Sequence, residues 1–151
     1  AIAEAIRSGR SARATHLRIR EWAEAWGVDP AIREVIARSE KEPPAEYSHQ
    51  QGWVLIAFQN ALYQLLHAPN LDAAVKDTVM RGGDTDTNAA ICGALWGAIE
   101  GRSGIPDQWE RAVLNCRPEY GREGVMQPRP AMFWPVDALE LAEALVSGPR
   151  S

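Results

Sequence analysis

The chain is poor in cysteine and has no apolar run long enough to span a bilayer. Its two cysteines, Cys92 and Cys116, lie far apart in sequence, which excludes a disulfide framework and the ligand spacing of a zinc site. No secretory signal, internal repeat or membrane-spanning segment is visible in the 151 residues. We therefore expect a cytoplasmic protein with no membrane partner.

An excess of basic charge is missing as well. Charged residues make up 24% of the chain and the formal net charge is −4, which argues against non-specific nucleic-acid binding, so no nucleic-acid partner is expected. The arginines near the N-terminus are interspersed with glutamates at helical spacing and predict a solvated helix face. With 46% hydrophobic residues, a chain of this length can bury the core of one domain.

The sequence also lacks the alternation of apolar and polar residues that is typical of strands, because its apolar residues recur at helical spacing nearly throughout. We predict an all-α fold with helices at 11–26, 30–38, 53–67, 71–80 and 136–146, and another after Asn88. Residues 40–52 and 116–134 are predicted connections, the first because paired prolines interrupt any helix. The segment 53–67 is apolar on nearly all sides and should be the central buried helix, so its polar members need buried partners: Gln59, Asn60 and Gln64.

What the chain does have is a concentrated acidic run between a diglycine and a helix start. Asp84, Thr85, Asp86 and Thr87 follow Gly82-Gly83, and one such residue is enough to cap a helix. If the two carboxylates converge to about 5–6 Å, they repel by on the order of 3 kcal/mol at an effective dielectric of about 20. Three outcomes stay open: a divalent cation offsets the repulsion, the side chains diverge into solvent, or one carboxyl has a raised pKa.

Magnesium suits this set of oxygen atoms, because it takes carboxylates, an occasional threonine hydroxyl and several waters. The pattern does not fit a calcium-binding EF-hand loop. Counted from Asp84, the sixth residue is Ala89 where that loop needs glycine, and the twelfth is Leu95 where it needs glutamate. The run therefore predicts part of a magnesium site.

The helix after this run carries almost no side-chain bulk on two neighbouring ridges. One ridge is formed by Ala89, Gly93, Gly97 and Gly101, and the other by Ala90, Ala94 and Ala98. Other helices can therefore approach it closely. A membrane dimer motif is excluded because the segment is too short and is bounded by Asp and Arg.

These residues resemble the C-terminal signature of the ADP-ribosylglycohydrolase family, which includes the enzyme that removes ADP-ribose from dinitrogenase reductase. The resemblance is carried by Gly82-Gly83-Asp84-Thr85-Asp86-Thr87, by the Ala-Ile-x-Gly-Ala that follows at 90–94, and by Gly101 to Ile105-Pro106-x-x-Trp109. It extends upstream to Gly52-Trp53-Val54-Leu55-Ile56-Ala57 and downstream to Trp134-Pro135-Val136-Asp137.

The resemblance implies a compact, orthogonal all-helical bundle with two Mg²⁺ ions. It also implies hydrolysis of the glycosidic bond between ADP-ribose and a protein side chain or small acceptor. The implied substrate is thus an ADP-ribosylated protein or a small ADP-ribose conjugate. Asp84 and Asp86 become the candidate catalytic residues and, with Thr87, the candidate metal ligands.

Candidate substrate contacts lie around the loop before the central helix, where relatives place residues near the adenosine side. They are Tyr47, Gly52 and, from the acidic run, Gly83. The simpler interpretation of Tyr47 and His49 is a surface loop. His16 and His67 are expected on the surface or at a helix end, and the loop arginines Arg117, Arg122 and Arg129 have the chemistry to pair with a pyrophosphate.

One part of the family pattern is absent. Relatives carry a second metal cluster, a Thr-Asp-Asp run near the N-terminus, and no Asp-Asp pair occurs in this sequence. We expect residues 1–151 to be a single all-helical domain or the C-terminal part of one, completed by a missing N-terminal segment or by a second chain. The alternative is a non-catalytic module of this family that binds ADP-ribose or a partner.

Overall fold

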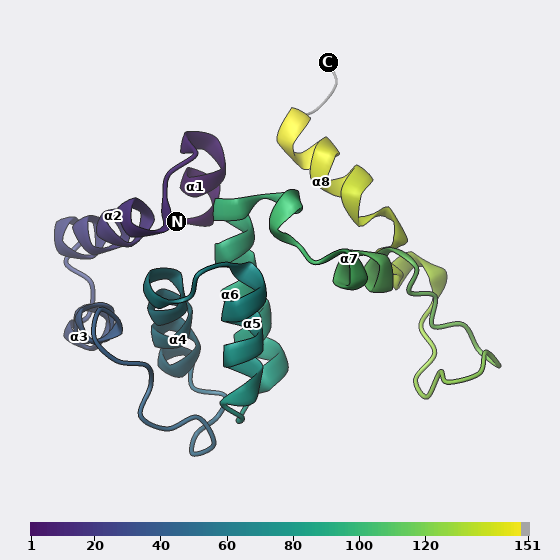
Figure 1. Cartoon of the computed structure of the whole chain (residues 1–151), viewed down its shortest axis with the longest axis horizontal. Coiled ribbons are helices and arrows are strands. Elements are labelled where there is room, and N and C mark those ends of the chain that lie inside the picture. The colour runs from purple at the N-terminus through teal and green to yellow at the C-terminus, as the bar shows by residue number, and fades with distance from the viewer. Residues whose placement is uncertain (149–151) are drawn as a thin grey trace. The chain divides into compact units, whose positions relative to one another are not determined.

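The computed structural model describes residues 1–148 and divides the chain into two compact units, Ala1–Ile105 and a second beginning at Pro106 (Figure 1). The predicted all-α class is confirmed, and the described part contains no strand. The helices of the first unit are α1 Ile2–Ser8, α2 Ala12–Ala25, α3 Pro30–Ser39, α4 Val54–His67, α5 Leu71–Met80, α6 Thr85–Glu100 and the short η1 Arg102–Gly104. In residues 1–148 no helix combines the length and the apolar character needed to cross a bilayer.

Helix α4 lies at the centre of the first unit, as its apolar sequence predicts. It packs against α2, α3, α5 and α6, and α5 packs along α6 (Figure 1). The core joins Ile19 and Ala23 of α2 and Ile36 of α3 to one face of α4 and to Leu95 of α6. Burial of these side chains supplies most of the stabilisation of the unit, at about 25 cal/mol per Å² of apolar surface removed from water.

The predicted helix starts agree with the capping side chains in the structure. Ser11 accepts a hydrogen bond from the Ala14 backbone N–H at α2. Asp29 accepts from Ala31 at α3, where Pro30 opens the helix, and Asn70 accepts from Ala73 at α5. These residue types can be recognised in sequence because each satisfies an orphan N–H of the first helical turn.

The small-residue ridge of α6 faces α5, which confirms the close helix packing predicted for it. A Cβ atom added at Gly93 would lie 3.5 Å from Val75 Cγ2, and one at Gly97 would lie 3.9 Å from Leu71 Cδ1. At its C-terminal end α6 also holds the start of α5, because the Glu100 carboxylate accepts a hydrogen bond of 3.0 Å from the Leu71 backbone N–H. The two helices are therefore fixed against each other in register.

One expectation for α2 is wrong. His16, expected at the surface, is 3% exposed and hydrogen-bonds Ser39, whereas the apolar Trp26 is 71% exposed. The polar partner on α3 lets the histidine occupy an inward position. Trp26 follows the last residue of α2 and stacks on Trp22, with 5.6 Å between the ring centroids. His67 is exposed at the end of α4, as expected.

The second unit contains α7 Asp107–Leu114, the short helices η2 Ala131–Phe133 and η3 Pro135–Asp137, and α8 Ala138–Ser147. The predicted connection 116–134 is confirmed in its larger part: residues 116–130 have no regular structure, whereas η2 lies within its C-terminal end. Its arginines hydrogen-bond main-chain carbonyl groups of this unit: Arg117 to Leu114, Arg122 to Arg117 and Arg129 to Pro128. The structure therefore gives these arginines a part in the local folding of the connection.

The two cysteines lie in opposite environments. Cys92 of α6 is fully buried, and burial raises the pKa of its thiol to about 11, whereas Cys116 is exposed. Since the thiolate is the reactive form, we expect a thiol reagent at neutral pH to label one cysteine per native chain and two in denaturant. Mass spectrometry of the labelled chain checks this, and native labelling of Cys92 would contradict the burial described.

Candidate functional site

The acidic run forms the N-terminus of α6. Asp84 is the N-cap residue, and its Oδ1 accepts a hydrogen bond of 3.4 Å from the Thr87 backbone N–H. Gly82 and Gly83 before it have φ angles of +79° and +71°, a conformation that favours glycine. The diglycine thus makes the sharp turn from α5 into α6 that presents the acidic side chains at the helix end.

The Asp84 and Asp86 carboxyl groups are near neighbours at this helix end. The Asp84 side chain is the largest cause of a lowered Asp86 pKa, followed by hydrogen bonds from the backbone N–H groups of Thr87 and of Asp86 itself. Asp86 and Thr87 are exposed, so their oxygen atoms are accessible to an ion or substrate.

The donor set at this helix end fits a hard divalent cation. It combines two carboxylates with an accessible threonine hydroxyl, the ligand types that magnesium prefers. Within residues 1–148 no cluster of three His, Cys, Asp or Glu side chains gathers to hold a metal. The chain therefore offers two acidic side chains here, and an octahedral shell around a bound ion would need hydroxyl groups, waters or another segment for its remaining positions.

One turn further along α6, Asn88 is 1% exposed, and its Nδ2 has no hydrogen-bond partner in the described part of the chain. Its backbone N–H donates to the Asp84 carbonyl oxygen at 3.1 Å. Leaving a buried amide unsatisfied costs about 1–3 kcal/mol. Asn88 Nδ2 is therefore an unsatisfied buried donor on α6, four residues after Asp84.

Tyr47 sets the position of the turn through its main chain. A Cβ atom added at Gly83 would lie only 2.0 Å from the Tyr47 carbonyl oxygen and 2.7 Å from its carbonyl carbon. Gly83 is thus required both for its backbone conformation and for this close approach. The structure brings Gly83 and Tyr47 together, whereas Gly52 is exposed with open space around its Cα.

A buried hydrogen-bond chain anchors Tyr47 to the core. Its ring is 6% exposed, and its hydroxyl donates to Asn60 Oδ1 at 2.8 Å. Asn60 Nδ2 donates to Thr78 Oγ1 at 2.9 Å, and Thr78 donates to the Ala74 carbonyl oxygen at 2.8 Å. Tyr47 is therefore part of the core and not the surface-loop residue of the simpler interpretation; a contact between it and substrate stays a prediction.

Arg81, the residue before the diglycine, is held from two sides. Its guanidinium lies over the rings of Tyr47 and Tyr63, 5.7 Å and 5.6 Å from their centroids, and its Nε donates to Asp77 Oδ2 at 2.6 Å. The same Asp77 oxygen accepts a hydrogen bond from Gln64 of α4. The three polar residues of α4 thus have hydrogen-bond partners: Asn60 and Gln64 bond Thr78 and Asp77 of α5, and Gln59 donates to the Glu42 carbonyl oxygen.

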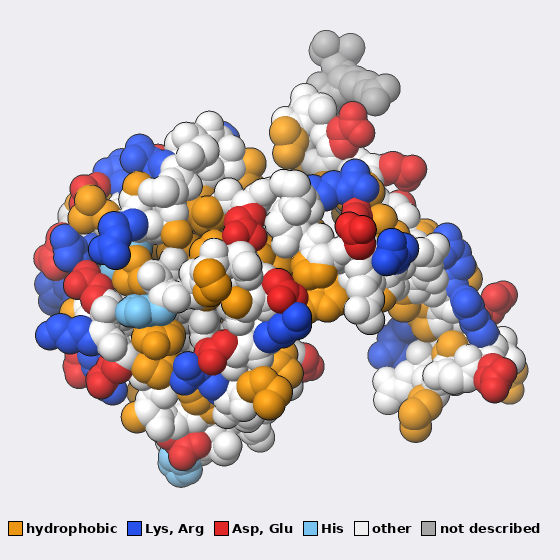
Figure 2. All heavy atoms as spheres, viewed as in Figure 1, with side chains coloured by type: hydrophobic (Ala, Val, Ile, Leu, Met, Phe, Trp, Pro, Cys, Tyr) orange, Lys and Arg blue, Asp and Glu red, His pale blue; other side chains and the backbone are white. Residues whose placement is uncertain are grey.

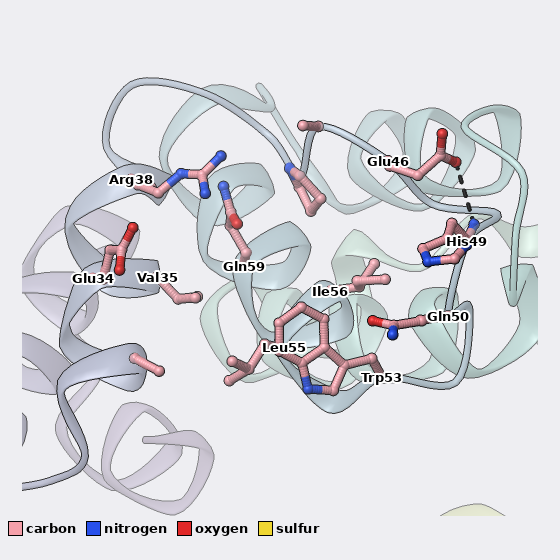
Figure 3. Close-up of a pocket in the computed structure, with 13 residues that line it drawn as sticks. Glu34, Val35, Arg38, Glu46, His49, Gln50, Trp53, Leu55, Ile56 and Gln59 are labelled. Atoms are coloured by element: carbon pink, nitrogen blue, oxygen red, sulfur yellow. Dashed lines mark hydrogen bonds between the residues drawn. The ribbon is translucent and has the colours of Figure 1, made fainter.

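The predicted loop 40–52 borders a pocket of about 310 Å³ between α3 and the start of α4 (Figure 3). Trp53, which is 53% exposed, presents its indole to the pocket, flanked by Leu55 and Gln50. Glu46 orders the loop, because its Oε1 accepts hydrogen bonds from the backbone N–H groups of Tyr47, Ser48 and His49, which lower the Glu46 pKa.

Sequence analysis did not single out Trp53 or the pocket. The tryptophan appears in the motif only as the first apolar residue of the central helix, and the α3 residues that complete the pocket lie 15 or more positions upstream. The sequence does place Trp53 at the N-terminus of the central helix. An aromatic side chain at that position is free to point away from the core, which could have indicated its exposure. Helix α4 begins at Val54 with Trp53 as its N-cap residue.

The burial of Tyr47 predicts a pH-dependent stability. Burial raises its pKa to about 12 from an ordinary value of 10.0, so the folded state disfavours the tyrosinate. The stabilisation is complete below pH 10 and is lost as the pH rises toward 12, by about 2–3 kcal/mol at full ionisation. Denaturant unfolding at a series of pH values checks this against Tyr47→Phe, whose free energy of unfolding should lack this fall; parallel pH curves would contradict it.

Comparisons with known proteins place this geometry in context. The model of the ADP-ribosylglycohydrolase family matches residues 1–147. A protein of Acanthamoeba polyphaga mimivirus, whose name describes an ADP-ribosyl glycohydrolase, is 52% identical over 44 residues, which are 29% of this chain and 13% of that relative. The matched segment is thus a small part of the relative's length. No solved structure matches the chain.

Proposed function

Because this chain belongs to the ADP-ribosylglycohydrolase family, we propose that it takes part in hydrolysing the glycosidic bond that links ADP-ribose to a protein side chain or small acceptor. The reaction breaks the bond between the ribose anomeric carbon and the acceptor atom; water supplies the hydroxyl group to the ribose and the proton to the acceptor. The observation that carries the proposal is the placement of Asp84 as the N-cap residue of α6, with Asp86 and Thr87 exposed in the first turn of that helix.

In this proposal Asp84, Asp86 and Thr87 hold magnesium, with two ions in the complete site. When bound, magnesium orients water and ribose hydroxyl groups and stabilises developing charge. The chain's own contribution is the placement of the ligands. Asp84 is fixed by its cap hydrogen bond to Thr87 N–H, and the Asp86 carboxylate by two backbone N–H groups. Prepositioned ligands lose little conformational freedom on binding.

In this proposal a second polypeptide segment supplies the metal ligands that the present chain lacks. Two carboxylates and one hydroxyl cannot ligate two octahedral ions without further ligands, and Asn88 Nδ2 offers an unused buried donor beside them. The second segment has to provide hard oxygen ligands. The Thr-Asp-Asp run that the family pattern places near the N-terminus is the sequence that would provide them.

The pocket lined by Trp53 is proposed to receive the adenine of the ADP-ribose group. The half-exposed indole offers a face for stacking, which contributes about 1–3 kcal/mol per base. We expect ADP-ribose to quench part of the tryptophan fluorescence of the 151-residue chain and Trp53→Leu to abolish the quenching. Trp26→Leu, at a still more exposed position outside the pocket, is the control; equal quenching in wild type and Trp53→Leu would refute the assignment.

The activity is tested by adding Mg²⁺ and ADP-ribosyl conjugates to the chain alone and to the chain mixed with the N-terminal segment of a family member. We expect release of free ADP-ribose only in the mixture, and its loss in excess EDTA. Hydrolysis by the mixture that continues at full rate in EDTA would reject the magnesium assignment. Arginine and serine conjugates are assayed separately, because the linkage specificity is set by the acceptor side of the site.

The alternative is a module that binds ADP-ribose or a partner without turnover. The specific observation in its favour is that only two acidic side chains meet at the turn, and no third joins them within residues 1–148. The same mixture distinguishes the two functions. Tight calorimetric binding of ADP-ribose without release of product supports the module, whereas magnesium-dependent product release supports the hydrolase.

A further inference from the structure

A second concave site lies at the end of α4 that is remote from the acidic turn. It is a cleft of about 370 Å³ between α2, the residue after α3 and the last turn of α4. Arg13, His16 and Arg20 of α2 line it together with Glu40 and His67. In Figure 1 the last turn of α4 and the turn from α5 into α6 lie at opposite ends of the bundle, so the cleft and the candidate metal site are separate.

Helical spacing explains why these α2 residues share the cleft. Arg13, His16, Leu17 and Arg20 stand at positions i, i+3, i+4 and i+7, which form one face of a helix. The neighbouring face carries Ile19 into the hydrophobic core. Two of the basic residues near the N-terminus, Arg13 and Arg20, thus border the cleft.

The cleft has more positive than negative charge. Arg20 Nη1 lies 3.0 Å from Glu40 Oε1, so these two charges are paired. Arg13 has no ion pair or hydrogen bond to its guanidinium within the part of the chain that the structure describes. An unpaired guanidinium offers a planar set of N–H donors that matches the oxygen atoms of phosphate.

His16 places a buried ring nitrogen beside these charges. Its Nε2 lies 3.1 Å from Ser39 Oγ, and the Ser39 hydroxyl donates to the Ile36 carbonyl oxygen at 2.7 Å. Nε2 therefore carries the hydrogen in the neutral ring, and Nδ1, 4.0 Å from Glu40 Oε1, is the free nitrogen. Burial is the largest cause of a lowered His16 pKa; Arg20 and Arg13 lower it further and Glu40 opposes them.

His67 faces the cleft from α4. Its Nδ1 donates to the Tyr63 carbonyl oxygen at 2.9 Å, which fixes the ring and leaves Nε2 free. The apolar side chains Leu17 and Leu66 form the rest of the lining. The cleft thus combines a free guanidinium, two oriented imidazoles and a small apolar surface.

We propose that this cleft binds a phosphate group, either as inorganic phosphate or as a phosphate monoester, with Arg13 as its principal donor. The phosphate oxygens accept hydrogen bonds from the Arg13 guanidinium, and the His67 ring lines the same cleft. The carbon chain of a monoester lies against Leu17 and Leu66. This inference does not depend on the proposed hydrolase activity, because it uses neither the acidic turn nor the Trp53 pocket.

The test follows the imidazole resonances of the 151-residue chain by NMR while inorganic phosphate is added in magnesium-free buffer at constant ionic strength. We expect saturable shifts at His16 and His67, and none at His49, which lies at the other pocket. Arg13→Ala should weaken binding by about tenfold or more, as expected for a hydrogen bond to a charged group. Arg33→Ala removes an exposed arginine of α3 outside the cleft and should leave the affinity unchanged.

A parallel titration with glycerol 3-phosphate separates the two sources of phosphate. Affinity several-fold above that of inorganic phosphate supports a monoester, and equal affinities support the free ion. Shifts that do not saturate, or an equal loss of affinity in the Arg13 and Arg33 variants, would overturn the proposal. Since no Mg²⁺ or ADP-ribose is present, a negative result here leaves the proposed hydrolase untouched.

Discussion

Gly83→Ala should lower the free energy of unfolding by about 2–6 kcal/mol. The new Cβ atom would lie 2.0 Å from the Tyr47 carbonyl oxygen, a main-chain atom that a rotamer change cannot move. It would also hold alanine at a φ of +71°. Strain of this kind costs about 1–3 kcal/mol and overpacking adds about 1–3 kcal/mol. Urea unfolding monitored by circular dichroism measures the change.

Gly93→Ala is the matched control for that substitution. It adds the same methyl group ten residues further along, where the Cβ atom meets Val75 Cγ2 at an ordinary 3.5 Å. Since alanine favours a helix over glycine by about 1 kcal/mol, the control should raise the free energy of unfolding or leave it unchanged. An equal loss in both variants would show that small residues are needed along α6 in general and not specifically beside Tyr47.

Asp86→Asn should abolish measurable binding of Mg²⁺. The substitution removes one of the two neighbouring carboxylate charges while keeping the size of the side chain. We expect a loss of at least about 100-fold in affinity, because removing even the outer partners of a metal ligand costs about 10–100-fold. Isothermal titration of Mg²⁺ into the chain completed by its second segment measures it, independently of turnover.

Two further variants make this result interpretable. Asp84→Asn should lose Mg²⁺ equally, yet keep the start of α6, because asparagine is as good an N-cap residue as aspartate. Asp72→Asn removes an exposed carboxylate at the opposite end of α5, where Asp72 pairs with Lys76, and should bind Mg²⁺ as wild type does. Retention of wild-type affinity by Asp86→Asn would remove Asp86 from the ligand set.

Local interactions explain which parts of the fold could be predicted from the sequence. The starts of α2, α3 and α5 follow from Ser11, Asp29 and Asn70, each of which bonds an N–H group two or three residues away. The central position of α4 follows from its continuous apolar run. The turn into α6 could also be located from the sequence, because a glycine pair precedes its N-cap residue Asp84.

The features that could not be predicted depend on residues far apart in the chain. Burial of His16 depends on Ser39, 23 positions away, and burial of Tyr47 depends on Asn60 and through it on Thr78. The pocket beside Trp53 needs α3 as well as α4. Helical periodicity assigns a residue to a face, but it does not say which polar group will stand opposite, so these side chains were expected at the surface.

The hydrogen bond between Glu100 and the Leu71 backbone N–H also restrains the other end of the α5–α6 pair, where the acidic turn lies. With α5 pinned by Glu100 at one extremity and by the Gly83–Tyr47 approach at the other, neither helix can slide along its neighbour. The α5–α6 pair is therefore held at both ends, and the position of the acidic turn relative to α5 depends in part on a carboxylate sixteen residues away from Asp84.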